Sequence, residues 1–279
     1  GVINTRDDIG NEITNLLESG GIRNFKMLSD EEEIIDFINF ELPELLIINF
    51  TDSEIDVETI MNKIRHDTWM NNFGIIGLFN QETSTEELLM KKYPEFNILS
   101  LLDNMRFRST LTKCIRIILE NRQIVFNRDL SEKLFDKDVG SFEIGNDPFA
   151  VSIYAGLASS MLMQRGLIKP ESRMHLQLVL SELIINGIEH GNCGITFDEK
   201  SDFLNNGGNI IDLIAQKCSE TGVDRKRVRV EWDIARNRSK FIIRDEGEGF
   251  DIFRLKEKIE KEGAYALHGR GIRMASLFA

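Results

Sequence analysis

Three polar residues recur at intervals of four within the apolar stretch SELIINGIEHGN, which covers residues 181–192. They are Glu182, Asn186 and His190. Residues four apart lie on one face of a helix, so these side chains would form a stripe. A carboxylate and an amide on so apolar a helix cost free energy unless they have partners. The stretch therefore indicates a functional site, with a solvated helix face as the alternative.

A second segment, DEGEGFD, begins at Asp245 where a predicted strand ends. Its glycines, Gly247 and Gly249, permit backbone shapes and close approaches that a Cβ would prevent. This pattern suits a ligand that lies against the main chain. Because glycine turns after strands are common, the segment alone is a weak signal.

The third segment, HGRGIRMASLF, covers residues 268–278 and reads as a glycine loop that opens a helix. Its first residues include Gly269, Arg270 and Gly271. The free N–H groups and the dipole at a helix N-terminus favour phosphate groups. In isolation this signal is also weak.

Helices and strands must position these three segments. The pattern predicts a helix over 149–165, ended by RGLIKP, and a second helix that begins near Glu171 and includes the first segment. Two strands are predicted at 227–234 and 240–245, and a short strand lies within 136–148. We therefore expect a domain boundary near residue 140.

The first hundred residues alternate short apolar runs with longer amphipathic ones, which is typical of a parallel sheet covered by helices. Strands are predicted at 25–28, 45–50, 74–79 and 96–99. Helices are predicted at 8–18, 31–42, 57–66 and 83–92. Together they give about five β/α units, which indicates an α/β fold.

Between the two halves, residues 106–134 read as one long helix that ends the first domain and runs onward. Apolar seam positions are predicted at Leu111, Ile115, Ile118, Val125 and Leu134. Such a seam would make the segment, taken as 106–139, a connecting helix that supports a homodimer; the alternative is a plain linker.

Composition narrows the class of protein. The 279 residues carry a formal net charge of −12, which disfavours nucleic-acid binding because that requires a basic surface. Three separated cysteines, without a CxxC pair, indicate neither a disulfide framework nor a zinc site. No apolar run reaches the roughly 20 residues of a membrane helix, and no signal peptide opens the chain. These features favour a cytoplasmic protein without direct membrane insertion.

The three chemical segments, in this order, resemble the boxes of the Bergerat-fold (GHKL, histidine-kinase-like) ATPases. ELIIN matches the N box, DEGEGF the first glycine box and GRGI the second. The resemblance spans residues 140–279 and implies a Bergerat-fold α/β sandwich with a mixed sheet that binds ATP and Mg²⁺. The joint match is far more specific than any one box.

The resemblance also implies a role for each matching residue. Asn186 would coordinate the magnesium ion, and Glu182 would act as the general base. Asp245 would accept a hydrogen bond from the adenine amino group, and Gly247 and Gly249 would let the backbone approach the base and ribose. Gly269 and Gly271 would cradle the phosphates, with Arg270 as a charge partner. His190 is expected to close the helix beside Gly191 rather than to act in catalysis.

Within that superfamily, EHGN directly after ELIIN and the GRGIRMASLF segment resemble the anti-sigma-factor serine kinases. These bind a sigma factor or similar protein and phosphorylate a serine on an antagonist, so partner switching is implied. The alternatives are a non-catalytic nucleotide-dependent switch and a histidine kinase, although no histidine lies between Arg106 and Met174. The family fold usually continues past the second glycine box, so an incomplete domain is expected at Ala279. Residues 193–225 form an insertion, with an extra helix predicted at 209–219.

Residues 1–122 resemble the receiver domain of two-component systems, a flavodoxin-like fold with a parallel sheet. Asn49 stands at the position of the phosphorylated aspartate, so the resemblance implies a pseudo-receiver. Phe79 replaces the family's threonine or serine, and Leu101 its lysine. Asp7 and Asp8 are the candidates for the acidic pair. The alternative is a generic flavodoxin-like domain without a phosphorelay role.

Overall fold

The computed structural model describes residues 1–65, 73–94, 96–121, 137–236 and 238–249. The chain divides into two compact units. The first contains Gly1–Leu134 and Gly156–Met174, and the second contains Phe135–Ala155 and His175–Ala279. The predicted domain limits, 1–122 and 140–279, stay predictions. Each unit has its own sheet.

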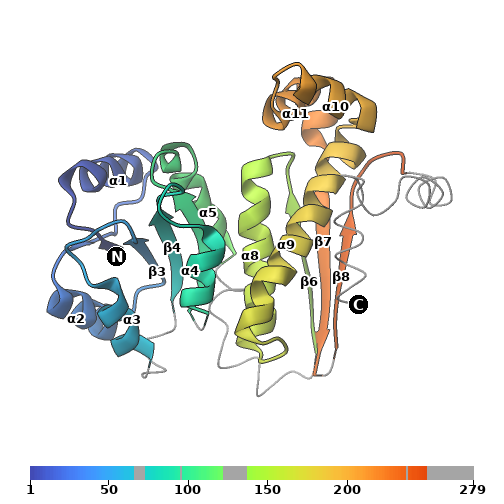
Figure 1. Cartoon of the computed structure of the whole chain (residues 1–279). Coiled ribbons are helices and arrows are strands. Elements are labelled where there is room, and N and C mark those ends of the chain that lie inside the picture. The colour runs from blue at the N-terminus through green and yellow to red at the C-terminus, as the bar shows by residue number, and fades with distance from the viewer. Residues whose placement is uncertain (66–72, 95, 122–136, 237, 250–279) are drawn as a thin grey trace. The chain divides into compact units, whose positions relative to one another are not determined.

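The sheet of the first unit has five parallel strands in the order β2-β1-β3-β4-β5, which is the flavodoxin-like order (Figure 1). The strands are β1 (Val2–Ile3), β2 (Met27–Leu28), β3 (Leu45–Asn49), β4 (Gly74–Phe79) and β5 (Ile98–Asp103). Parallel neighbours require crossover connections, and helices supply them here. The predicted α/β class and parallel sheet are confirmed.

The helices of this sheet cover both of its faces. They are α1 (Asp7–Ser19), α2 (Glu31–Glu41), α3 (Val57–Arg65), α4 (Glu86–Lys92) and α5 (Leu111–Glu120). Buried residues of α2, α3 and α4 share one core with alternate strand residues such as Leu46 and Ile48, while α1 packs against α5. Strands buried on both faces read as continuous apolar runs, which is why β3 and β4 were predictable.

Two strands differ from the prediction. β1 was missed because it has only two residues, although Val2 and Ile3 are buried and pair with β2 and β3. β5 begins at Ile98 rather than at Phe96 and continues to Asp103. Phe96 is fully buried although it lies before the strand. Because buried residues are apolar both inside and outside a strand, the sequence did not show where β5 begins.

The prediction of one long helix from Arg106 was wrong over its described part. A 3₁₀ turn, η1 (Phe107–Ser109), precedes α5, which ends at Glu120. Leu111, Ile115 and Ile118 are buried within this unit, so they are not available as a dimer seam. The remaining seam positions, Val125 and Leu134, lie outside the described residues. A homodimer therefore stays a prediction without this support.

The second unit contains an antiparallel sheet in the order β6-β7-β8, made of β6 (Lys137–Ile144), β7 (Val228–Ala235) and β8 (Arg238–Arg244). One face is apolar, and there the Phe142 ring lies 4.9 Å from the ring of Tyr154 and 5.4 Å from that of Trp232. The other face carries ion pairs such as Lys137 with Asp233 at 3.1 Å. The three described strands are all antiparallel, whereas a mixed sheet was predicted.

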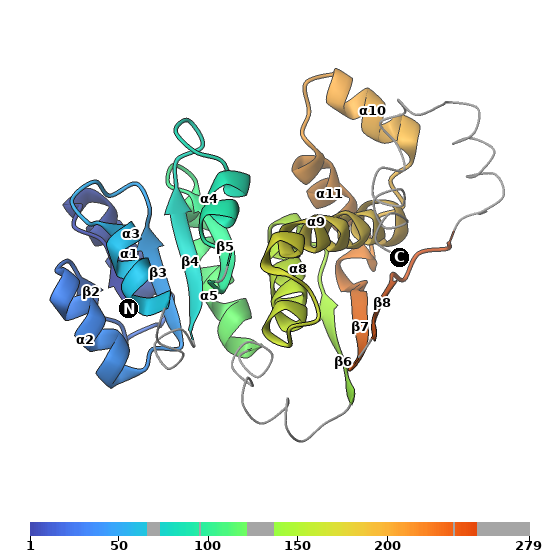
Figure 2. The ribbon, with the colours of Figure 1, turned by 60° about the horizontal axis from the view of Figure 1, so that its bottom comes forward.

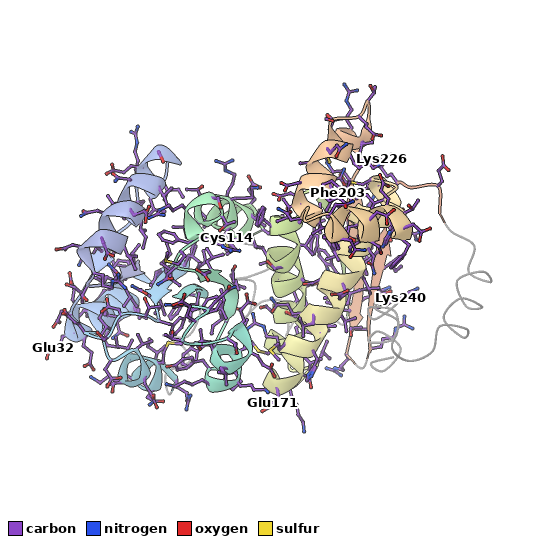
Figure 3. The ribbon with its side chains drawn as sticks, turned by 45° about the horizontal axis from the view of Figure 1, so that its top comes forward. Glu32, Cys114, Glu171, Phe203, Lys226 and Lys240 are labelled. Carbon is purple, nitrogen blue, oxygen red and sulfur yellow. The ribbon has the colours of Figure 1, made fainter. Side chains whose placement is uncertain are left out.

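Helices α8 (Pro148–Gln164) and α9 (Pro170–Asn186) confirm the two helices predicted before and at the first chemical segment (Figure 2). β7 and β8 confirm the two predicted strands, and α11 (Ile210–Cys218) the extra helix of the insertion. α10 (Phe197–Asn205) was not predicted; Thr196 and Glu199 form a capping box at its start. Phe203 of α10, and Lys226 just beyond η3 (Val223–Arg225), mark this region in Figure 3. Among the described helices, none has the length and apolar character to cross a membrane.

Candidate functional site

The candidate site begins where α9 changes its helical geometry. α9 ends at Asn186 and continues as a π-helical turn, η2 (Gly187–Asn192). The N–H of Cys193 donates to the carbonyl of Ile188 at 2.9 Å, a bond that spans five residues. π-turns are rare and occur often at functional sites.

The predicted stripe of polar residues spans this change of helical geometry. Glu182 and Asn186 lie one α-helical turn apart and are both half-buried. His190, beyond the change of geometry, is exposed, and its Nδ1 lies 2.7 Å from the carbonyl oxygen of Ile195. His190 thus differs from Glu182 and Asn186 in its exposure and in its bond to the main chain, and the stripe of three residues stays a prediction. The structural role expected for His190 agrees with its bond to the main chain.

The side chains of Glu182 and Asn186 are the polar groups of α9 nearest to the π-turn. Within the ranges that the structure describes, neither side chain makes a hydrogen bond or an ion pair. A half-buried amide or carboxylate without a protein partner must bond to water or to a ligand. The amide oxygen of Asn186 is thus an available hard ligand.

The first glycine box lies directly against the π-turn. A Cβ at Gly191 would lie 2.3 Å from Cγ of Asp245, and one at Gly187 would lie 3.6 Å from Cβ of Asp245. A Cβ at Gly247 would lie 2.5 Å from the carbonyl oxygen of Gly191. Glycine at 191 therefore leaves the space that Asp245 occupies, while Gly187 lies in ordinary contact with it. The structure thus brings together two segments that the sequence separates by more than fifty residues.

Asp245 keeps one carboxylate oxygen available. Its Oδ1 accepts from the N–H of Gly247 at 2.9 Å, which forms an Asx turn. No described residue bonds to Oδ2, and Asp245 is exposed. Gly249 has φ of +77°, which favours glycine. Oδ2 can therefore accept a hydrogen bond from a ligand N–H group.

Other buried polar groups nearby have structural partners. Glu189 is 2% exposed and forms an ion pair with Lys200 of α10. Burial and the neighbouring Cys218 thiol raise the pKa of Cys193 to about 12, so this thiol is protonated at neutral pH. These groups hold the insertion against the end of α9.

The predicted phosphate-binding residues, Gly269, Arg270 and Gly271, lie outside the described residues. In the described part of the chain no group of three His, Cys, Asp or Glu residues is arranged to hold a metal. A nucleotide-bound Mg²⁺ needs few protein ligands, because phosphates and water supply most of its oxygens. The unpartnered oxygen of Asn186 fits this limited role.

A second polar cluster lies at the carboxyl ends of β1 and β3. Asn49 is 1% exposed, and its Nδ2 donates to Oδ1 of Asn4 at 2.7 Å. Its Oδ1 accepts from the N–H of Thr51 at 3.0 Å and from the Thr51 hydroxyl at 2.7 Å. The amide is thus satisfied by protein groups on both sides. It has no anionic oxygen to attack a phosphorus atom.

Asp7 and Asp8 do not belong to this cluster. They lie exposed in the first turn of α1, where Asp8 pairs with Arg6 at 2.7 Å. The residues that follow β1 are instead Asn4, bonded to Asn49, and Thr5, whose hydroxyl donates to Asp52 at 2.8 Å. Neither residue is acidic, so no acidic pair directly follows β1. Phe79 and Leu101 are both buried apolar residues.

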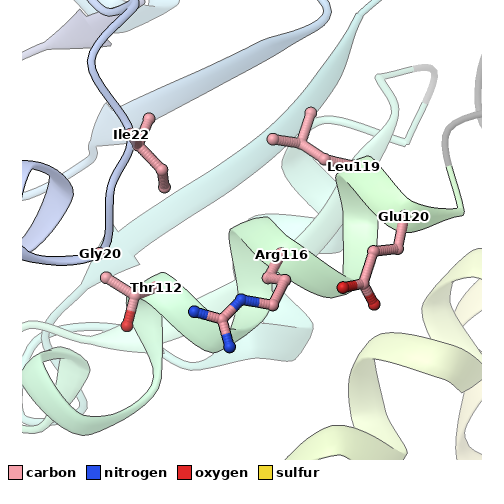
Figure 4. Close-up of a pocket in the computed structure, with 6 residues that line it drawn as sticks. All are labelled: Gly20, Ile22, Thr112, Arg116, Leu119 and Glu120. Atoms are coloured by element: carbon pink, nitrogen blue, oxygen red, sulfur yellow. The ribbon is translucent and has the colours of Figure 1, made fainter.

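A small hollow of about 240 Å³ lies between α5 and the segment after α1 (Figure 4). Its lining residues are Gly20, Ile22, Thr112, Arg116, Leu119 and Glu120. The charges of Arg116 and Glu120 oppose each other, so the lining favours no single ligand charge.

No protein-family model matches the chain. No curated protein matches it either. Function is therefore inferred from the residues and their geometry. The structure adds Gly187 and Gly191 to the candidate site; these two glycines, four residues apart in GIEHG, were the available signal for a close approach.

Proposed function

We propose that the second unit binds ATP with Mg²⁺ in the manner of the Bergerat-fold ATPases. The observation that carries this proposal is the packing of Asp245 against Gly187 and Gly191, directly after Asn186. It places an available carboxylate oxygen beside the helix end that bears an available amide oxygen. The spacing of Asn186 and Asp245 in the sequence does not by itself predict that they lie close together.

The base end of the nucleotide is assigned to the first glycine box. Oδ2 of Asp245 accepts from the exocyclic amino group of adenine, while Oδ1 stays bonded to Gly247. Gly247 packs on the carbonyl of Gly191, and the absence of a Cβ at Gly249, where no described atom lies within 4 Å, lets the base and ribose approach the main chain.

The phosphate end is assigned to α9 and the second glycine box. The amide oxygen of Asn186 holds Mg²⁺, which neutralises phosphate charge when bound. Glu182, one turn earlier on the same helix, orients a hydroxyl or water and accepts its proton. Gly269, Arg270 and Gly271 complete the phosphate contacts in this proposal.

For the reaction we infer transfer of the γ-phosphoryl group to a serine or threonine hydroxyl of a partner protein, as in anti-sigma-factor kinases. Positioning and charge neutralisation dominate phosphoryl transfer, so the chain needs few catalytic groups. In this account the first unit is a pseudo-receiver that binds a signalling partner. The fully satisfied amide of Asn49 supports that assignment.

The test is ATP turnover by Glu182→Gln. We expect the variant to bind Mg-ATP as the wild type does, but to release ADP about 100-fold more slowly, because the general base is lost. Glu171→Gln, which changes an exposed carboxylate at the start of the same helix, is the matched control. Equal turnover by Glu182→Gln and the wild type would remove Glu182 from the chemistry. Tight ATP binding without any turnover by the wild type would indicate a nucleotide-dependent switch instead.

A further inference from the structure

A closed set of hydrogen bonds ties the first glycine box to the end of the insertion. It contains the side chains of Asn146, Asn192 and Glu246 and the chain segment 223–227. We call it the asparagine relay. Neither Asn146 nor Asn192 belongs to a box of the proposed ATP site.

The relay runs in one direction. The N–H of Glu246 donates to Oδ1 of Asn192 at 2.8 Å, and Nδ2 of Asn192 donates to Oδ1 of Asn146 at 2.8 Å. Nδ2 of Asn146 then donates to the carbonyl of Val223 at 2.7 Å. A main-chain donor at one end and a main-chain acceptor at the other fix the orientation of both amides.

Two further bonds close the relay. The N–H of Arg227 donates to Oε2 of Glu246 at 2.8 Å, and Nζ of Lys226 donates to the carbonyl of Asn192 at 3.2 Å. Asn192 is 1% exposed. A buried amide with all its partners in place is strongly specified, because a lost partner leaves an unsatisfied polar group.

The relay acts on the residue next to Asp245. Glu246 N–H is held by Asn192 on one side, and Gly247 is packed on the carbonyl of Gly191 on the other. Both anchored residues follow Asp245 directly, and both are held by the same π-turn. Its free Oδ2 keeps a fixed position only while both anchors hold.

We propose that the asparagine relay determines base specificity by fixing Asp245 for a purine that bears an amino group at position 6. Asn192 and Asn146 are positioning residues, which act through Asp245. A 6-oxo purine presents an acceptor at that position, so two acceptors would face each other and binding would weaken. The inference rests on the proposed ATP site.

The relay also requires an amide at each position. An aspartate at 192 could still accept from Glu246 but could no longer donate to Asn146. Asn192→Asp therefore breaks the relay with almost no change in side-chain shape. Asn146→Asp breaks it at the next link, at a half-buried site that tolerates a charge more easily.

The experiment compares the dissociation constants of Mg-ATP and Mg-ITP, measured by calorimetry on the full chain. We expect the wild type to prefer ATP by at least about tenfold, because a hydrogen-bonding site rejects an analogue that lacks the bonded group. Asn192→Asp should lose most of this preference, through weaker binding of ATP rather than of ITP. Asn146→Asp should also reduce the preference for ATP over ITP. Asn209→Ala, which removes the cap of α11 in the insertion, should keep the wild-type preference.

The outcomes separate the inference from the proposed function. If the wild type binds neither nucleotide, the proposed ATP site is wrong and the inference falls with it. If the wild type prefers ATP and both relay variants keep that preference, the inference alone is overturned. Equal loss of affinity for both nucleotides would also overturn it, since that is the effect of a purely structural residue.

Discussion

At the scale of single residues, the candidate site depends on glycines, whose lack of a Cβ lets two segments pack closely. Gly191 leaves the space in which Asp245 lies, and Gly247 leaves the space for the carbonyl of Gly191. The sequence suggested that Gly247 and Gly249 matter, because they follow a predicted strand. The sequence did not show which residues these glycines contact, because the π-turn that contains Gly191 has no sequence pattern of its own. The chemical character of the single site residues was thus predictable from the sequence, but the contacts between them were not.

Gly191→Ala tests this packing. The added Cβ would lie 2.3 Å from Cγ of Asp245, so the carboxylate must move. Overpacking costs typically about 1 to 3 kcal/mol, against about 1 kcal/mol gained from alanine's higher helix propensity. The difference is at most about 2 kcal/mol, so we expect ATP affinity to fall severalfold and by no more than about 30-fold, since each 1.4 kcal/mol is a factor of ten.

The control for this variant is Gly145→Ala, because a Cβ there would meet no atom within 4 Å. Calorimetric titration with Mg-ATP should give a wild-type constant for the control. Wild-type affinity in Gly191→Ala would show that the contact with Asp245 does not position a ligand group.

Asp52 gives a prediction about pH. Burial alone would raise its pKa, but hydrogen bonds from Thr5 and from the N–H of Glu54 outweigh this and lower the pKa below the usual range. The ionised form therefore stabilises the folded state above about pH 4, and this contribution is lost as the pH falls through the lowered pKa.

We expect Asp52→Asn to lower the free energy of unfolding by about 1.5 to 3 kcal/mol at pH 7, and by much less at pH 3. Urea unfolding at the two pH values measures this difference. Asp36→Asn, at an exposed position of α2, serves as the control. A loss of the same size at both pH values would contradict the role of the charge.

At the scale of elements, periodic patterns predicted α1, α2, α8, α9 and the strands with long apolar runs. The misses have physical causes. β1 is too short to show a pattern, and α10 has a charged sequence that begins with a capping box. α5 ends at Glu120, and at its C-cap Nδ2 of Asn121 donates to the carbonyl of Ile117 at 2.8 Å.

The insertion offers a prediction at this scale. Oδ1 of Asn209 accepts from the N–H groups of Ile211 and Asp212, at 2.8 and 3.2 Å, and so caps α11. Asn209→Ala should cost about 1 kcal/mol of stability, as measured by urea unfolding. ATP affinity should not change, because this cap lies outside the relay. A clear loss of affinity would show that α11 itself is coupled to the ligand site.

At the scale of the whole molecule, the chain combines two units with different chemistry. In the first, the polar end of the parallel sheet is occupied by hydrogen-bonded amides. In the second, polar side chains at the end of α9 remain unpaired in the described structure. Sequence patterns predicted both an α/β first half and the order of elements in the second. They could not show which polar groups would be satisfied, because that depends on contacts between distant segments.

The most direct test of the ATP site is the melting temperature with and without Mg-ATP, for the wild type and for Asn186→Ala. Ligand at a hundred times its dissociation constant adds about 2.7 kcal/mol, which should raise the wild-type midpoint by about 5 to 10 °C. We expect this rise in the wild type and little or none in Asn186→Ala, whose ligand-free midpoint should stay close to that of the wild type. No rise in the wild type, or an equal rise in both proteins, would contradict the account.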